Sequence, residues 1–382
     1  MAVFKGLKST LAESRDLGRL LTTDPEERPI VFYAEDTFTY VQYEGYVSSL
    51  LAAGRKIAYV TSAAHDPLIA DPPSGLQPFY VDKQLPRLFE KLDSKVLAIT
   101  MPDLGQFQVP VPPVETTAYV FHSLNSTHTA YRTGAFDHYD AFLCTGPHHV
   151  AELRALRSQR GLPEPELFEV GYYKLDRIIR DHAAYTKKWP TDTTVLVAPS
   201  WGRGNILEAH GAEVVSALRA EGFRVIVRPH PQFFHSLYPE GEGIVAGLER
   251  QFGEDPLVVI EKSIDTEDSF HEADVMVSDW SGAAYEYAFG TLRPVAFIET
   301  PQKIFNDEWQ EIGLGSFERD LRSQVGQIVE PAAVGRLVAD LVHRTTEWRD
   351  ELEAIRRQVV FNIGKAAEVG AEVLGALAER KR

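Results

Sequence analysis

Two histidines follow short apolar runs that are typical of buried strands, and imidazole is well suited to proton transfer near neutral pH. His230 and Arg228 lie in an Arg-Pro-His-Pro segment directly after the run 224–227, where the prolines end the strand. His122 directly follows the run 118–121. Either histidine alone is more simply explained as a structural hydrogen-bonding group. Two histidines at strand ends, beside turns suited to binding phosphate, favour a catalytic role.

A turn of small polar residues separates an apolar run from a helix in the stretch 273–288. The N-terminus of a helix presents unpaired N–H groups and the positive end of the helix dipole, and together these bind phosphate. The turn therefore predicts a nucleotide site, although an ordinary helix cap explains the same residues about equally well. The residues assigned here to a nucleotide donor are Ser278, Asp279, Ser281, Gly282 and Glu286.

A third predicted strand end carries further polar groups. After the apolar run 194–198, a flexible loop contains the hydroxyl of Ser200 and the guanidinium of Arg203. Arginine matches the geometry of phosphate oxygens. We expect both side chains, together with Arg228, to contact the donor.

Length and composition limit the classes of protein that this chain can be. Its 382 residues exceed what one hydrophobic core usually spans, so two domains are expected. The formal net charge of −16 and the pI near 5.2 argue against nucleic acid as a partner. Cys144 is the single cysteine, no apolar run could cross a bilayer, and no signal peptide is recognisable. These features predict a cytoplasmic protein.

Residues 3–22 have the pattern of an amphipathic helix. Lys5, Lys8 and Arg15 on its polar side would suit an anionic membrane surface, but Glu13 and Asp16 dilute that charge. Packing against its own domain is therefore the preferred interpretation. Peripheral contact with the inner face of the membrane is the weaker alternative.

Strand-like and helical segments alternate along most of the chain, which is typical of α/β domains with parallel sheets. The first seven strand-like runs are 30–34, 57–61, 79–81, 96–101, 118–121, 141–145 and 167–170, with a helix at 147–159. After a linker at 185–192, five more runs follow at 194–198, 224–227, 257–260, 274–277 and 295–298. Helices are expected at 332–345 and over 348–380.

This alternation predicts two Rossmann-like domains, residues 1–190 and 191–382, whose parallel sheets face each other across a cleft. Parallel strands with right-handed crossovers place all their carboxyl ends on one edge, where ligands bind. His122 and His230 should then lie on opposite walls of the cleft.

The motifs together resemble the CDP-glycerol glycerophosphotransferases of teichoic-acid and capsule synthesis, over about residues 115–375. Each motif is weak alone, whereas their order and spacing are fairly specific. The matching segments are Ala198-Pro199-Ser200-Trp201 with Arg203, Arg228-Pro229-His230-Pro231, Ser278-Asp279-Trp280-Ser281-Gly282 with Glu286, Tyr139-Asp140, Gly171 with Asp176, and Phe361-Asn362 with Gly364-Lys365-Ala366.

The resemblance implies the two-domain GT-B fold, with a nucleotide-donor site in the second domain and a last helix, about 360–380, that packs back on the first. His122 and His230 match the two catalytic histidines of the family, and Ser278, Ser281 and Gly282 match its pyrophosphate-binding turn. One departure concerns the acceptor side. The family usually has His-Gly-Thr/Ser-Pro after its first-domain strand, whereas this chain has His-Ser-Leu-Asn at 122–125.

The implied reaction is attack of an acceptor hydroxyl on the β-phosphorus of CDP-glycerol, with release of CMP. His122 would be the general base, and His230 with Arg228 would neutralise charge on the leaving phosphate. The acceptor would be a cell-surface glycan or a teichoic-acid-like polymer. No cofactor is implied.

The sequence predicts a reaction that is independent of metal, since it contains no His-x-x-x-His motif, no cysteine pair and no convincing Asp-x-Asp motif. Walker and Gly-x-Gly-x-x-Gly loops are also absent, which disfavours ATP hydrolysis and dinucleotide redox chemistry.

Three other functions stay open at this point. A GT-B glycosyltransferase would use the same turn for a nucleotide sugar, with Glu286 on the ribose. A UDP-sugar 2-epimerase would isomerise its sugar with no acceptor present. A catalytically silent binding module would be favoured if neither histidine lay in the cleft.

Overall fold

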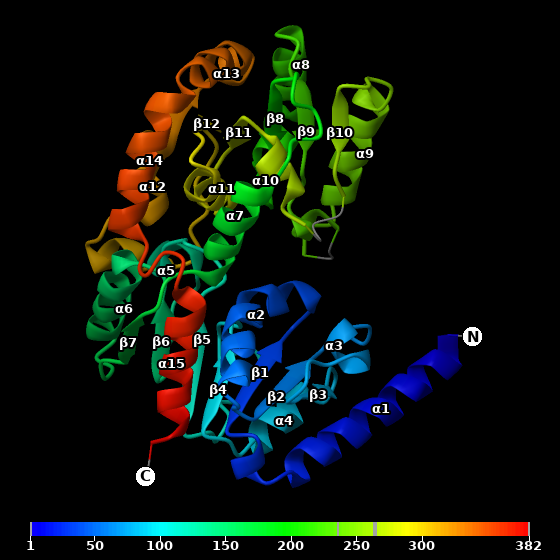
Figure 1. The fold of residues 1–382 in the computed structure, drawn as a ribbon, viewed down its shortest axis with the longest axis vertical. Helices are drawn as coiled ribbons and strands as arrows, with labels where there is room; N and C mark the ends of the chain where they lie inside the picture. Colours follow the sequence, from blue (N-terminus) through cyan, green and yellow to red (C-terminus); the bar gives the residue numbers. More distant parts are fainter. Residues whose placement is uncertain (1, 235–236, 263–265, 381–382) are drawn as a thin grey trace.

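The computed structural model describes residues 2–234, 237–262 and 266–380. It contains two parallel sheets, each flanked by helices, one in the lower and one in the upper half of Figure 1. The expected α/β architecture of two Rossmann-like domains is confirmed.

The first sheet has seven strands in the order β3-β2-β1-β4-β5-β6-β7. These strands are β1 (Ile30–Ala34), β2 (Ile57–Thr61), β3 (Leu76–Tyr80), β4 (Val96–Ile99), β5 (Thr116–Val120), β6 (Ala141–Cys144) and β7 (Glu166–Glu169). The helices in this part of the chain are α1 (Ala2–Thr22), α2 (Thr37–Ala52), α3 (Pro67–Ala70), α4 (Leu85–Lys91), α5 (Thr127–Ala130), α6 (Pro147–Gln159) and α7 (Tyr173–Ala184).

Strand β1 shows how helices cover both faces of the first sheet. Its five residues are all buried. Val31 and Tyr33 pack with Leu88 of α4, on the face that also contacts α1, whereas Phe32 packs on the opposite face with Leu374. Burial on both faces explains why the strand is a continuous apolar run instead of an alternating one.

The second sheet has six strands in the order β10-β9-β8-β11-β12-β13. These strands are β8 (Thr194–Val197), β9 (Arg224–Val227), β10 (Val258–Ile260), β11 (Val275–Ser278), β12 (Val295–Ile298) and β13 (Gly326–Val329). The remaining helices are α8 (Ile206–Ala220), α9 (Gly241–Phe252), α10 (Asp268–Glu272), α11 (Ala283–Thr291), α12 (Phe317–Val325), α13 (Val334–His343), α14 (Thr345–Val359) and α15 (Ala366–Ala378).

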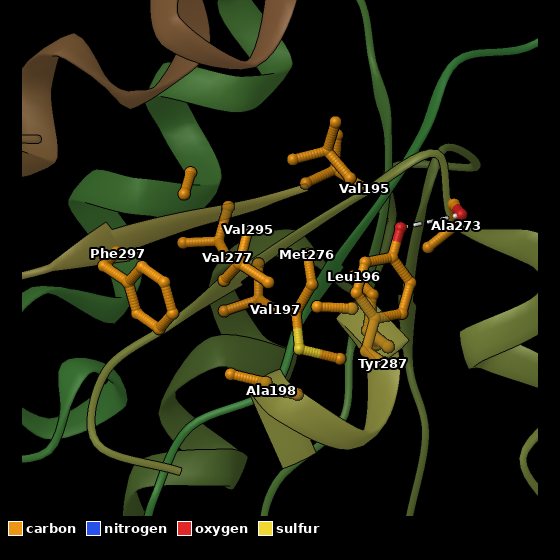
Figure 2. Packing of buried hydrophobic residues seen from close by; sticks show 14 of the residues in the cluster. Val195, Leu196, Val197, Ala198, Ala273, Met276, Val277, Tyr287, Val295 and Phe297 are labelled. Atoms are coloured by element: carbon orange, nitrogen blue, oxygen red, sulfur yellow. Dashed lines mark hydrogen bonds between the residues drawn. The ribbon is translucent and has the colours of Figure 1, made fainter. Parts of the chain in front are cut away.

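The core of the second domain is densely aliphatic around its central strands. Figure 2 shows Val197 of β8 beside Val277 of β11, its partner in the parallel register, and both are fully buried. Tyr287 of α11 is also buried, and its hydroxyl donates to the carbonyl of Ala273 at 3.0 Å. That hydrogen bond satisfies the polar atom of a side chain enclosed in the core.

All twelve strand-like runs expected from the sequence correspond to strands, with shifts of a few residues at their ends. Strand β13, at the edge of the second sheet, was not predicted from the sequence. It contains a glycine and a glutamine, and Ile328 is 54% exposed. A short edge strand with one face in solvent lacks the apolar run on which the prediction depended.

The first sheet ends at Glu169 and the second begins at Thr194, with α7 between them in the sequence. The domain boundary at residue 190 stays a prediction within that interval.

The C-terminal segment crosses from the second domain back to the first, as the resemblance implied. Helix α14 packs against α11 and α12, whereas α15 packs against α2, and Figure 1 shows them in orange and red on different domains. The expectation of one helical stretch over 348–380 is wrong. Asn362 and Gly364 have φ values of 43° and 78°, so the left-handed backbone there ends the first helix.

The crossing is held by Asp176 and Gly171, two residues that the family motif singled out. Asp176 accepts from the backbone N–H of Gly364 at 2.6 Å and of Ala366 at 2.9 Å. Gly171 has a φ of 99°, and a Cβ there would lie 2.4 Å from the carbonyl oxygen of Phe361. Only glycine allows both this backbone and this close approach.

Helix α1 packs against its own domain, as preferred. Leu17 and Leu20 are buried in the core of the first domain. Glu13 accepts from the N–H of Asp82 and Gln84, and Asp16 accepts from that of Tyr80. The acids therefore hold the segment after β3. None of the described helices is long and apolar enough to cross a bilayer.

Candidate functional site

A cavity of about 510 Å³ lies at the carboxyl ends of both sheets and has walls from both domains. This is the edge at which open α/β sheets bind ligands. Most of the residues predicted from the sequence line it, namely His122, Ser200, Arg228, His230, Ser281, Gly282 and Glu286.

His122 lies two residues after β5 and is exposed to the cavity, although protein atoms enclose it. This enclosure lowers the pKa of His122, and the Lys174 ammonium lowers it further, whereas Glu286 acts in the opposite direction. The backbone of Thr100 also acts to raise the pKa of His122. A neutral imidazole has one ring nitrogen that can accept a proton.

His230 follows β9 on the opposite wall. Burial, followed by the charges of Lys303 and Lys174, lowers the pKa of His230 to about 3. Its Nδ1 accepts from the backbone N–H of Gln232 at 3.1 Å. The proton of the neutral ring is therefore assigned to Nε2, which makes that nitrogen a donor. Because Lys174 affects both histidines, both rings lie within electrostatic range of one ammonium group.

Three of the residues predicted to contact the donor, Ser278, Asp279 and Arg203, are not among the described residues that line the cavity. The hydroxyl of Ser278 is buried and donates to the carbonyl of Ala198 at 2.7 Å, so it points into the sheet instead of the cavity. Asp279 is fully buried and accepts from the N–H groups of Ser200 and Ile206 at 2.6 and 3.1 Å. It links the turn after β8 to the turn after β11, and burial raises its pKa.

Arg203 is the third of these residues. Its side chain is 86% exposed and lies 3.2 Å from Glu240. It is not among the described residues that line the cavity. The loop after β8 turns outward at Gly202, whose φ is 89°, and this turn carries the guanidinium to the surface.

The turn before α11 brings the two domains into direct contact. Ser281 and Gly282 line the cavity, and a Cβ on Gly282 would lie only 2.4 Å from Oδ1 of Asn125. A side chain at 282 would therefore separate the two walls. The N–H groups of Ala284 and Tyr285 bond back to the carbonyls of Ser281 and Gly282, both at 3.1 Å, so the turn offers an anion chiefly the positive end of the helix dipole.

Glu286 takes part in a network that crosses between the domains. Its Oε2 accepts from Nζ of Lys174 at 2.7 Å, and its Oε1 lies 2.7 Å from the hydroxyl of Tyr172. That hydroxyl is also 2.7 Å from the carbonyl oxygen of His122. Glu286 therefore positions the His122 segment as well as lining the cavity.

Arg228 has partners on the second-domain wall. Its Nη1 donates to the hydroxyl of Ser269 at 2.7 Å and to the carbonyl of Thr266 at 2.8 Å, and it lies 3.2 Å from Glu261. The guanidinium also lies over the ring of Phe270, 5.5 Å from its centroid. These contacts fix its position at the cavity.

Lys303 lines the same cavity and was missed in the sequence. Its Nζ is 4.6 Å from the centroid of the Trp201 ring and has no hydrogen-bond partner in the described part of the chain. Burial lowers its pKa to about 8, whereas Asp279 raises it. The residue follows β12 in the sequence, so its place after a predicted strand was a signal that could have identified it.

Glu318 and Lys174 were also missed. Both lie in helices, α12 and α7, and line the cavity. No strand-end position or motif marks either residue, so the sequence contains no comparable signal for them.

Within the described ranges, no three His, Cys, Asp or Glu side chains converge in a way that could hold a metal ion. Independence of metal stays a prediction, because a substrate diphosphate can itself bind a cation.

No protein-family model matches the chain, and no curated protein matches it either. Several solved structures are similar to this chain. The wall teichoic acid polymerase TagF is 13% identical with a TM-score of 0.62, and the match covers 99% of this chain and 97% of that chain. The UDP-GlcNAc 2-epimerase of Neisseria meningitidis, bound to UDP-GlcNAc, is 10% identical with a TM-score of 0.56, covering 91% and 99%. At these identities the likeness establishes the two-domain GT-B fold alone.

Proposed function

We propose that this protein is a transferase that moves glycerol phosphate, or a related polyol phosphate, from a CDP-linked donor to a hydroxyl of a cell-surface glycan or teichoic-acid-like acceptor. One observation carries the proposal. Histidines at strand ends of opposite domains line a single cavity, beside the turn at Ser281 and Gly282. The motifs that resemble the glycerophosphotransferases supply the choice of donor.

In the proposed reaction, His122 accepts the proton of the acceptor hydroxyl. Its lowered pKa keeps the ring neutral near pH 7, which a general base requires. The acceptor oxygen forms a bond to the β-phosphorus, and the bond from that phosphorus to the oxygen of CMP breaks. CMP leaves with the electron pair of that bond.

Charge on the phosphates is stabilised by donors from the second domain. Ser281, Gly282 and the N-terminus of α11 bind the diphosphate. Lys303 supplies a cation that forms no hydrogen bond to a carboxylate in the described chain. Nε2 of His230 donates to the leaving phosphate, and a bound anion would raise the pKa of this histidine above its value in the free protein.

The donor is tested by incubating the purified protein with CDP-glycerol or with UDP-N-acetylglucosamine and separating the nucleotides by chromatography. Even without an acceptor, slow transfer to water should release CMP from CDP-glycerol and leave the UDP-sugar unchanged. An isomerised UDP-sugar would instead support an epimerase. Release of UDP only when a glycan is added would support a glycosyltransferase.

The same assay tests independence of metal. We expect CMP release to persist in excess EDTA, because Lys303, His230 and the helix N-terminus provide the electrophilic stabilisation. Turnover that is abolished by EDTA and restored by Mg²⁺ would contradict this part of the proposal.

A further inference from the structure

Glu318 of α12 reaches from the second domain to the first. Its Oε1 accepts from the backbone N–H of Ser126 at 2.9 Å, and the N–H of Phe317 donates to the hydroxyl of Ser126 at 2.6 Å. The residue is only 4% exposed, yet it lines the cavity. One oxygen of this carboxyl group is therefore fixed by the first domain.

The second oxygen of Glu318 is unused. Its Oε2 is buried and has no hydrogen-bond partner among the residues that the structure describes, and the same holds for Oδ1 of Asn125. Both atoms are acceptors, and both residues line the cavity. Buried acceptors without a donor are rare because each loses its hydrogen bonds to water. The two atoms therefore indicate a ligand that brings donors.

These acceptors lie beside the turn before α11. Oδ1 of Asn125 would touch a Cβ on Gly282, and Glu318 is bonded to the residue after Asn125. A group attached to a phosphate at that turn would therefore reach Asn125 and Glu318 next. A second phosphate is disfavoured there, because its oxygens would face oxygen acceptors.

The surroundings of Glu318 also suit a neutral hydroxyl ligand. Burial raises the pKa of Glu318 to about 7, and the nearby Glu152 raises it further, whereas contacts with Ser126 lower it. Glu318 in turn contributes to the raised pKa of Tyr131. The Tyr131 ring centroid is 6.2 Å from that of His122, which places the three residues in one region of the cavity.

We propose that Asn125 and Glu318 form a subsite that binds the hydroxyl groups of the polyol attached to the β-phosphate of the donor. The proposal deepens the proposed function and rests on it for the identity of the donor. It names the hydroxyl group as the feature that is recognised and Glu318 as the residue that determines specificity.

The experiment compares CDP-glycerol with the propyl ester of CDP, which lacks both free hydroxyls of the glyceryl group. Dissociation constants are measured by calorimetry. At pH 8, above the pKa of about 7 of Glu318, the wild-type protein should bind CDP-glycerol at least about tenfold more tightly, as expected for hydrogen bonds to a charged acceptor. In Glu318→Gln, this ratio should fall to about threefold or less, because a neutral amide replaces the unused oxygen.

Glu318→Gln retains an oxygen for the N–H of Ser126, so it should preserve the domain contact. Asp320→Asn is the matched control, since it removes an exposed carboxylate from the same helix and should leave the ratio unchanged. A general loosening of the site would weaken the binding of both ligands alike, so it would not change the ratio of their dissociation constants. A wild-type ratio near one, or an unchanged ratio in Glu318→Gln, would overturn the subsite.

A different result is expected if the donor is not linked to CDP. If neither CDP compound nor CDP binds the wild-type protein, the CDP-linked donor is refuted. The subsite is then tested with UDP-N-acetylglucosamine and UDP, where Glu318→Gln should again lose the affinity that depends on hydroxyl groups. Equal loss for both UDP ligands would refute the subsite as well.

Discussion

His122 and His230 lie on opposite walls of one cavity, but they differ in the hydrogen bonds of their rings. His122 is exposed to the cavity, where its neutral ring can present an acceptor nitrogen. His230 accepts from the backbone N–H of Gln232, which leaves Nε2 as a donor. Burial keeps both rings neutral.

This difference teaches that two similar strand-end histidines have opposite chemical capacities. The neighbours of each ring decide the matter, because the N–H of Gln232 selects one tautomer of His230, whereas the ring of His122 can adopt the tautomer that accepts a proton. His122 is suited to take a proton from an acceptor hydroxyl. His230 is suited to donate a hydrogen bond to a phosphate.

The largest expected effect is that of His122→Ala. Turnover should fall by about 10² to 10⁴, the usual contribution of a positioned base, while the dissociation constant for CDP-glycerol stays the same. His122→Gln should be no better, since an amide cannot accept the proton. Turnover is followed by CMP release, and His343→Ala, at an exposed position, is the control. Full activity in folded His122→Ala would refute the role of base.

His230→Ala should lower turnover by about 10 to 10² and also weaken donor binding, because it removes one hydrogen bond to the phosphates. His230→Gln should recover part of this loss, since its amide can still donate. The comparison between the two histidines is tested most sharply by the different effects expected of their glutamine variants. If the glutamine variant recovered the same fraction of turnover at both histidines in steady-state kinetics, the tautomers would not matter.

Ser281→Leu should weaken binding of CDP by about tenfold, because a bulky side chain blocks the approach of a phosphate to the N-terminus of α11. The thermal midpoint should change little, since Ser281 lines the cavity. Ser323→Leu, at an exposed position of α12, is the matched control. Unchanged affinity for CDP and CMP in titration calorimetry would refute a phosphate site at this turn.

The smallest expected effect is the pH dependence that Lys303 confers on CDP binding. Its pKa of about 8 in the free protein means that the ammonium is present below that pH and lost above it. Affinity should therefore fall, by at most about tenfold, between pH 7.5 and 9.5. Lys303→Arg should flatten this profile because arginine stays charged. An equally steep profile in that variant would assign the titration to another group.

The sequence by itself determined the strands, their parallel order along two units, and the place of His122 and His230 at strand ends. Buried parallel strands are recognisable because both of their faces are apolar. The polar residues that stop them then fall at the edge where ligands bind. Edge strand β13 was not predicted because only one of its faces is buried. The break between α14 and α15 was not visible in the helical pattern.

Only the tertiary structure decided which polar groups reach the cavity. Ser278 and Asp279 belong to the same motif as Ser281, yet their side chains hold the loop after β8 and the sheet. Lys303 and Glu318 carry no motif and nevertheless line the cavity. Local sequence fixes where a strand ends, whereas the direction of a side chain and its free hydrogen-bonding atoms depend on partners far along the chain.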